Sequence, residues 1–139
     1  MNKINLGRVL LGGLLAGIVI SAGNFLLNRV WLRDAMNAEF TRLHVPEPGT
    51  DFIIKAVVLS LILGIVTIYL YAAIRPRFGP GVKTAIGAGL MAWFFVVLYA
   101  GVVIGMALRM PLDLILKRTV FGLFEYVIAA VAGAWLYKE

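Results

Sequence analysis

Long apolar stretches alternate with short polar ones along the whole chain, and four of the apolar stretches are long enough to cross a membrane as a helix. They run over residues 9–32, 52–74, 84–108 and 114–137. A helix of about 20 residues crosses the roughly 30 Å hydrocarbon core of a bilayer. The pattern therefore predicts a single all-α integral membrane domain over residues 1–139, a bundle of four transmembrane helices that run up, down, up and down.

The one long connection, residues 33–51, carries a helical pattern of its own. Met36, Phe40 and Leu43 recur at helical spacing, with charged residues between them. Apolar residues every three or four positions beside charged ones are typical of a helix that lies at a membrane surface. We therefore expect a short interfacial amphipathic helix between the first two spans.

Composition excludes an ordinary soluble domain, because 62% of the residues are hydrophobic and only 14% are charged. The net charge of +6 comes from basic residues near the ends of the spans. Phospholipid head groups are the expected counter-charges there, so membrane lipids are predicted partners and nucleic acid is not.

An even number of spans places both termini on the same side of the membrane. Arginine and lysine divide almost evenly between the two sides, so their bias does not fix the orientation. The turn between the second and third spans, residues 75–83, carries basic charge and no acid. This favours the cytoplasm for that turn and for both termini.

Small residues recur at four-residue steps within the spans, above all Gly13, Gly17 and Ser21 in the first. Lipid supplies no hydrophobic drive for helix association, so such stripes are where helix backbones approach closely. They predict contacts within the bundle. The stripe in the first span is also a candidate for self-association or for contact with other membrane subunits.

Polar residues inside the spans gather toward the end that holds the long connection. The fourth span contains Glu125, and an ionised group at that depth is costly unless it faces inward with a partner. We predict a ligand-binding polar pocket lined by Asn24, Asn28, Tyr99, Glu125 and Tyr126. Basic residues are expected around its mouth: Arg29, Lys55, Arg109 and Arg118. The alternative is that the asparagines and the glutamate only hydrogen-bond helices to one another or to a partner subunit.

The sequence offers few groups for catalysis or metal binding. It contains no cysteine, and its single histidine, His44, lies in the long connection without further ligands nearby, so no metal site and no cofactor are predicted. An alternative is that His44 is an axial ligand to a pigment or haem held with another subunit. No serine–histidine–acid set and no paired carboxylates occur, so no catalytic residue is assigned and the protein is not expected to be an enzyme.

The stretch YAAIRPRFGPGVKTA over residues 71–85 and the closing AGAWLYKE over residues 132–139 resemble a group of small bacterial four-helix integral membrane proteins of unknown function. The resemblance covers nearly the whole chain and implies a bacterial inner-membrane location, but no activity. Small multidrug-resistance transporters are also four short helices with one membrane glutamate. Their glutamate lies in the first span, where this chain has only Asn24, so their function is not carried over.

Two functions fit these observations. The first is a non-catalytic accessory or stabilising subunit of a larger membrane complex, which the small size, the small-residue stripes and the lack of catalytic groups indicate. The second is a small transporter or binding protein for a lipophilic or cationic ligand that uses a buried Glu125.

Overall fold

The computed structural model describes residues 3–137, which form helices and no strands. The helices are α1 (Leu6–Phe25) with a π-helical continuation (Leu26–Trp31), α2 (Arg33–Arg42), α3 (Thr50–Phe78), α4 (Val82–Trp93) with a π-helical continuation (Phe94–Gly101) that leads into α5 (Val102–Ala107), and α6 (Leu112–Leu136). Four continuous stretches are long and apolar enough to cross a membrane. The predicted all-α class and the four long apolar helices are confirmed, each boundary to within a few residues.

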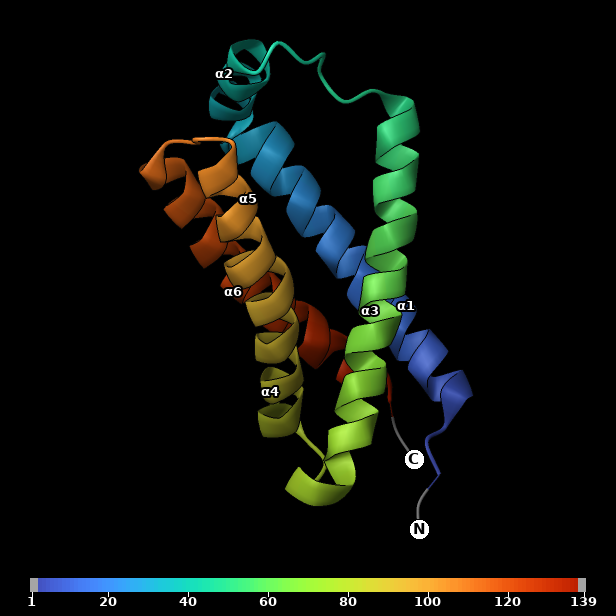
Figure 1. Cartoon of the computed structure of the whole chain (residues 1–139). Coiled ribbons are helices and arrows are strands. Elements are labelled where there is room, and N and C mark those ends of the chain that lie inside the picture. The colour runs from blue at the N-terminus through green and yellow to red at the C-terminus, as the bar shows by residue number, and fades with distance from the viewer. Residues whose placement is uncertain (1–2, 138–139) are drawn as a thin grey trace.

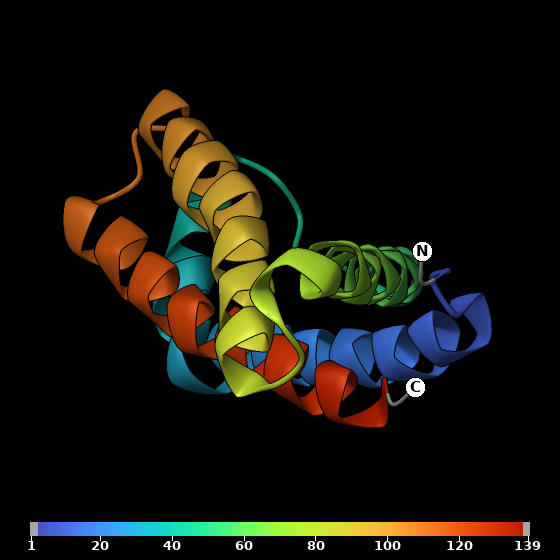
Figure 2. The same cartoon turned by 90° about the horizontal axis from the view of Figure 1, so that it is seen from below.

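The ends of the helices gather at two opposite ends of the molecule. Figure 1 shows both ends of the chain and the α3–α4 turn together, which we call the termini end. At the other end lie α2, residues 43–49 and the α5–α6 connection, which we call the loop end. Consecutive long helices contact each other, and α1 also packs against α6. Figure 2 shows α4 lying over α6, with α1 running alongside the last part of α6.

Small residues bring the backbones of α1 and α3 into contact. A Cβ atom added at Gly64 of α3 would lie 2.6 Å from the Cα atom of Gly17, and one added at Gly17 would lie 2.9 Å from the backbone oxygen of Ser60. Gly13 packs against the same part of α3. The predicted stripe is therefore confirmed as a helix contact within the chain. Gly13 and Gly17 are buried beneath α3, while self-association or contact with other membrane subunits through the stripe that includes Ser21 stays a prediction.

α6 meets its two neighbours in the same way. A Cβ atom at Gly89 of α4 would lie 2.8 Å from the backbone oxygen of Tyr126, and Gly12 of α1 faces Gly133. Where three helices meet, Ile68 of α3 is fully buried. Close approach through small residues is thus the common way in which this bundle packs.

α2 packs across the loop end of the bundle. Its Met36 is 8% exposed and belongs to a buried cluster with Leu27, Leu32 and Leu114. The short helix predicted between the first two spans is confirmed, while its location at a membrane interface stays a prediction. Glu39, one of the charged residues between the apolar positions of this helix, is only 6% exposed.

An arginine explains how Glu39 is buried. Arg42 Nε donates to Glu39 Oε2 at 3.0 Å, and Arg42 Nη2 donates to the backbone oxygen of Leu108 at 2.6 Å. The hydrogen bond to Glu39 also raises the pKa of Arg42 above its ordinary value. One side chain therefore neutralises the buried acid and joins α2 to the end of α5.

Candidate functional site

A cavity of about 470 Å³ lies at the loop end between α1, α2 and α3. Small-molecule sites in proteins have volumes of about 300–1,000 Å³. α1 and α3 touch where Gly17 meets Ser60 and separate toward the loop end, as Figure 1 shows. The walls of this loop-end cavity are therefore the parts of α1 and α3 that no longer touch each other, bridged by α2 and the loop that follows it.

The loop-end cavity extends far along the helices. Its lining includes Ser21, ten residues before the end of the first helical stretch at Trp31, and Ser60, ten residues after the start of α3 at Thr50. With a rise of about 1.5 Å per residue, both serines lie about 15 Å from the helix ends. That depth is about half of a 30 Å hydrocarbon core.

One wall of the cavity is polar. Its residues come from α1, the π-helical continuation and α2: Ser21, Asn24, Asn28, Arg29, Arg33 and Asn37. Asn28 Nδ2 donates to the backbone oxygen of Asn24 at 2.9 Å, which orients the amide. Ser21 Oγ and Asn28 Oδ1 are buried and have no hydrogen-bond partner among residues 3–137. Both oxygens therefore lie beneath the surface of the cavity, where an unmatched buried polar atom costs about 1–3 kcal/mol.

The π-helical segment Leu26–Trp31 sets the direction of two of these side chains. Its backbone hydrogen bonds span five residues instead of four, so the turn is wider and rotates the following side chains relative to a continuous α-helix. Asn28 and Arg29 both lie in this turn, and Arg29 Nη2 donates to the backbone oxygen of Pro48 at 3.0 Å. Single π-helical turns are frequent at functional sites.

Positive charge dominates the lining. Arg29, Arg33 and Arg118 border the cavity, whereas the acid in the lining is Glu47 alone. Arg118 Nη1 contacts the sulfur of Met36 at 3.6 Å, and a thioether is only a weak acceptor. Among the described residues, none of the three arginines forms an ion pair. The cavity therefore offers guanidinium groups that have hydrogen-bond donors to spare.

The remaining lining is apolar. It is formed mainly by Phe25, Phe40, Phe52, Ile53, Ala56 and Val57. Phe25 is 62% exposed and Phe52 is 58% exposed, so apolar surface on the outside of the bundle continues into the cavity. A positive polar wall opposite an apolar one suits an amphipathic molecule better than a wholly polar one.

The structure brings four of the nine predicted pocket residues to this cavity: Asn24, Asn28, Arg29 and Arg118. Two of the residues expected at its mouth lie elsewhere. Lys55 pairs with Asp51, with 2.9 Å between Nζ and Oδ2, on the exposed side of α3. Arg109 is exposed in the α5–α6 connection, where it has a φ of 56°.

Glu125 faces the interior of the bundle but does not line the loop-end cavity. It is 7% exposed and packs on Gly23 of α1, where an added Cβ atom would lie 2.7 Å from the Glu125 Cδ atom. The predicted inward orientation is confirmed. The predicted pocket shared with Asn24 and Asn28 is not formed, because Gly23 faces α6 whereas both asparagines face the cavity. Glu125 Oε1 is buried without a hydrogen-bond partner among the residues described.

The two tyrosines of the predicted pocket are also placed elsewhere. Tyr99 lies in the second π-helical segment and is 65% exposed, on the outer surface of the bundle. Tyr126 is 4% exposed and packs in the core at the contact with α4. One tyrosine is on the outer surface and the other is inside the packed interior, so they do not converge on one site.

The structure also adds lining residues that the sequence prediction missed, among them Ser21, Arg33, Asn37 and Ser60. A signal for the first three was present in the sequence. Polar residues recur every three to five positions at Ser21, Asn24, Asn28, Arg33 and Asn37. This series continues one helical face from α1 into α2, across the boundary between the first span and the expected surface helix.

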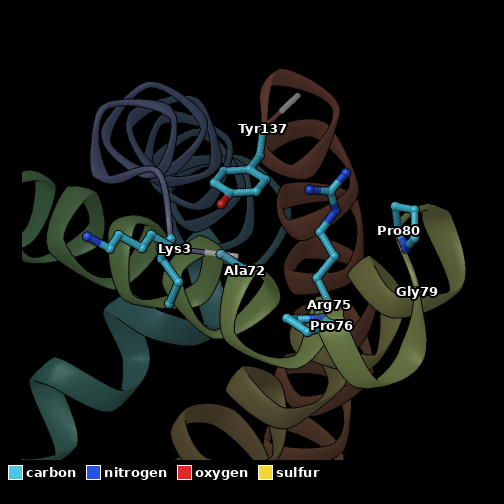
Figure 3. A pocket seen from close by; sticks show the side chains of 8 residues that line it. Lys3, Ala72, Arg75, Pro76, Gly79, Pro80 and Tyr137 are labelled. Carbon is cyan, nitrogen blue, oxygen red and sulfur yellow. The ribbon is translucent and has the colours of Figure 1, made fainter. Parts of the chain in front are cut away.

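A smaller cavity of about 300 Å³ lies at the termini end, and Figure 3 shows the side chains that line it. The guanidinium of Arg75 lies 5.4 Å from the ring centroid of Tyr137, a cation–π contact. The Lys3 side chain points away from that ring in Figure 3. Since polar groups here already contact one another and the volume is smaller, the loop-end cavity is the stronger candidate site.

Metal ligands are not gathered anywhere in the described part of the chain. Residues 3–137 contain no group of three or more histidines, cysteines, aspartates or glutamates that could hold a metal ion. His44 lies in the connection after α2 with a φ of 56°. The hypothesis that it ligates a pigment or haem with another subunit stays untested.

Comparison with known proteins gives no match to a family model, to a curated protein or to a solved structure. The resemblance to small bacterial membrane proteins therefore stays a prediction. What the loop-end cavity does is inferred from the chemistry of its own residues.

Proposed function

We propose that the chain is a non-catalytic integral membrane protein that binds an amphipathic molecule in the loop-end cavity. The four long helices cross the bilayer in alternating directions, so the cavity lies in the half of the bilayer nearest α2. The observation that carries the proposal is the cavity itself, whose lining includes three arginines without an ion pair among residues 3–137 and a set of apolar side chains.

The outer surface of the bundle supports membrane insertion. Large apolar side chains are exposed on every long helix, for example Leu10 at 51%, Leu59 at 65%, Phe95 at 64% and Ile128 at 58%. In water, so much contiguous apolar surface would cost free energy in proportion to its area. When these side chains contact the hydrocarbon core of a bilayer instead of water, that cost is removed.

The cavity favours a binding role over a purely structural one. A subunit that only stabilises a complex has no need of three arginines without ion pairs around a 470 Å³ space. The accessory-subunit hypothesis remains compatible if the bound molecule is itself part of a larger assembly.

A cationic ligand is disfavoured on electrostatic grounds. Three arginines and one glutamate line the cavity, so a cation would be repelled. Glu125, the acid expected to attract it, lies at the α1–α6 contact instead. Of the two ligand classes expected from the sequence, the lipophilic one fits.

Filling the cavity tests the proposal. Ala56 is half-buried in the α3 wall, so Ala56→Trp occupies the space without deleting a packed side chain. Ala73 is exposed on the same helix near the termini end, which makes Ala73→Trp the matched control. We expect native mass spectrometry of detergent-purified protein to show a retained lipophilic molecule on the wild type and on Ala73→Trp, but not on Ala56→Trp.

Circular dichroism and gel filtration establish that the two tryptophan variants remain folded. Equal retention by all three proteins would place the binding outside the cavity and reject the proposal.

A further inference from the structure

We infer that the occupant of the loop-end cavity is a membrane lipid with an anionic, phosphate-bearing head group that enters from the surrounding bilayer. This inference rests on the proposed function and adds the chemical class of the ligand. It follows from the charge of the lining, from the order of polar and apolar groups with depth, and from the exposed apolar border.

The charge of the lining selects an anion. Arg29, Arg33 and Arg118 converge on the cavity from three different helical elements, and none of them is neutralised by an ion pair among residues 3–137. A guanidinium group binds phosphate oxygens through parallel N–H donors, which gives charge-assisted hydrogen bonds stronger than neutral ones. A phosphate head group would therefore satisfy donors that the chain itself leaves unused.

The order of groups with depth matches a lipid. Arg29 and Arg33 lie beside the helix end at Trp31, where head groups are expected. Ser21 is eight residues before Arg29, which is about 12 Å deeper. Asn28, directly before Arg29, lines the cavity with its polar side chain. Arg29 and Arg33 place charge at the outer end, Arg118 lies six residues or about 9 Å inside α6, and Ser21 is deeper still, so a head group is held near the helix ends and the acyl chain lies below it.

The apolar border indicates where the ligand comes from. Phe25, Phe52 and Val57 line the cavity and are 62%, 58% and 40% exposed on the lipid-facing surface of the bundle. An acyl chain can lie along these side chains while its head group reaches the arginines. A water-soluble phosphate compound would leave this apolar half unmatched, so the bilayer is the better source.

Lipid selectivity tests the inference. Native mass spectrometry is performed on the purified full chain with phosphatidylglycerol or phosphatidylcholine of identical acyl chains. The wild type is expected to retain the anionic lipid about tenfold better, equivalent to about 1.4 kcal/mol. Arg33→Gln with Arg118→Gln should abolish that preference. The matched control, Arg77→Gln with Arg109→Gln, removes two exposed arginines outside the cavity and should keep it.

The outcomes separate the inference from the proposed function. If the wild type retains both lipids equally and Ala56→Trp loses both, the cavity binds lipid but the head-group assignment is overturned. If neither lipid is retained, the inference fails, and the proposed function fails as well only if the wild type retains no other lipophilic molecule that Ala56→Trp loses. Loss of the preference in the control pair as well would show a general charge effect and overturn the inference.

Two further arms complete the test. An excess of glycerol 3-phosphate should leave phosphatidylglycerol bound, and displacement by this soluble head group would overturn the bilayer source. Should the double variant fail to fold, Arg33→Gln alone decides, since Arg33 is exposed at the rim and its loss should still weaken the preference. An unchanged preference in that single variant would then count against the inference.

Discussion

At the residue scale, Gly64 and Gly87 show how differently two helical glycines are placed in this bundle. A Cβ atom at Gly64 would lie 2.6 Å from the Cα atom of Gly17, whereas one at Gly87 has nothing within 4 Å. The first glycine is required by the α1–α3 crossing. The second lies at open surface on α4.

Gly64→Ala is therefore expected to lower the free energy of unfolding, because overpacking of a close contact costs about 1–3 kcal/mol. Gly87→Ala should be neutral or raise it by up to about 1 kcal/mol, since alanine favours the helix. Unfolding by denaturing detergent, followed by circular dichroism, measures both. Similar losses in the two variants would show that the crossing is not tightly packed.

Glu125 is the other residue whose surroundings make a sharp prediction. Removing one partner of a buried ion pair lowers the free energy of unfolding by about 3–5 kcal/mol. Glu125 packs on Gly23, and no described residue hydrogen-bonds its Oε1 atom. Glu125→Gln keeps the shape and carries no charge, so the free energy of unfolding should equal or exceed that of the wild type. A loss of several kcal/mol would reveal a partner for the carboxylate.

At the element scale, α2 depends on one side chain for its attachment to the far side of the loop end. Arg42 bonds Glu39 within α2 and the Leu108 backbone oxygen at the end of α5. The rest of the attachment includes the apolar cluster around Met36 and the contact of Arg118 with the Met36 sulfur. α2 also supplies Arg33 and Asn37 to the cavity wall, so its placement and the shape of the cavity are linked.

Arg42→Gln should loosen α2 without unfolding the bundle, because it leaves the Glu39 carboxylate buried and unpaired. Amide hydrogen exchange over residues 33–42 is expected to speed up by about tenfold while exchange in α3 stays unchanged. Lys55→Gln is the matched control: it breaks the Asp51 pair, whose side chains are 71% and 86% exposed, and such pairs contribute little. Equal exchange rates in both variants would contradict the role of Arg42.

At the scale of the whole molecule, the two ends of the bundle are chemically different. The loop end holds the larger cavity and α2, and the termini end holds the α3–α4 turn with its basic residues. If the four long helices cross a bilayer, α2 and that turn must lie on opposite sides of it.

Cysteine labelling tests this topology, and the chain has no native cysteine to interfere. Ala38 in α2 and Lys83 at the start of α4 are both exposed. In intact cells, a membrane-impermeant maleimide should label Ala38→Cys directly and Lys83→Cys only after permeabilisation. The reverse pattern would invert the orientation, and labelling of both in intact cells would exclude membrane insertion as proposed.

The four long helices could be predicted because long apolar runs and short turns are local features of the sequence. The site was predictable only in part, because side-chain direction depends on how helices cross. Asn24 and Gly23 are neighbours in sequence, yet one faces the cavity and the other faces Glu125. The π-helical segments also turn the side chains of Asn28 and Tyr99 away from the directions they would have in a continuous α-helix. The residue pattern does not predict where such a turn occurs.

The contact of Gly13 and Gly17 with Gly64 has a consequence for residues that never touch it. α1 and α3 cross at that contact, and the distance between the two helices increases from the crossing point to the loop end. A small change of the crossing angle therefore produces a larger displacement at the loop end, about 15 Å from Ser60 along α3. The gap available to a ligand at Arg29 is therefore set by the size of side chains deep in the bundle.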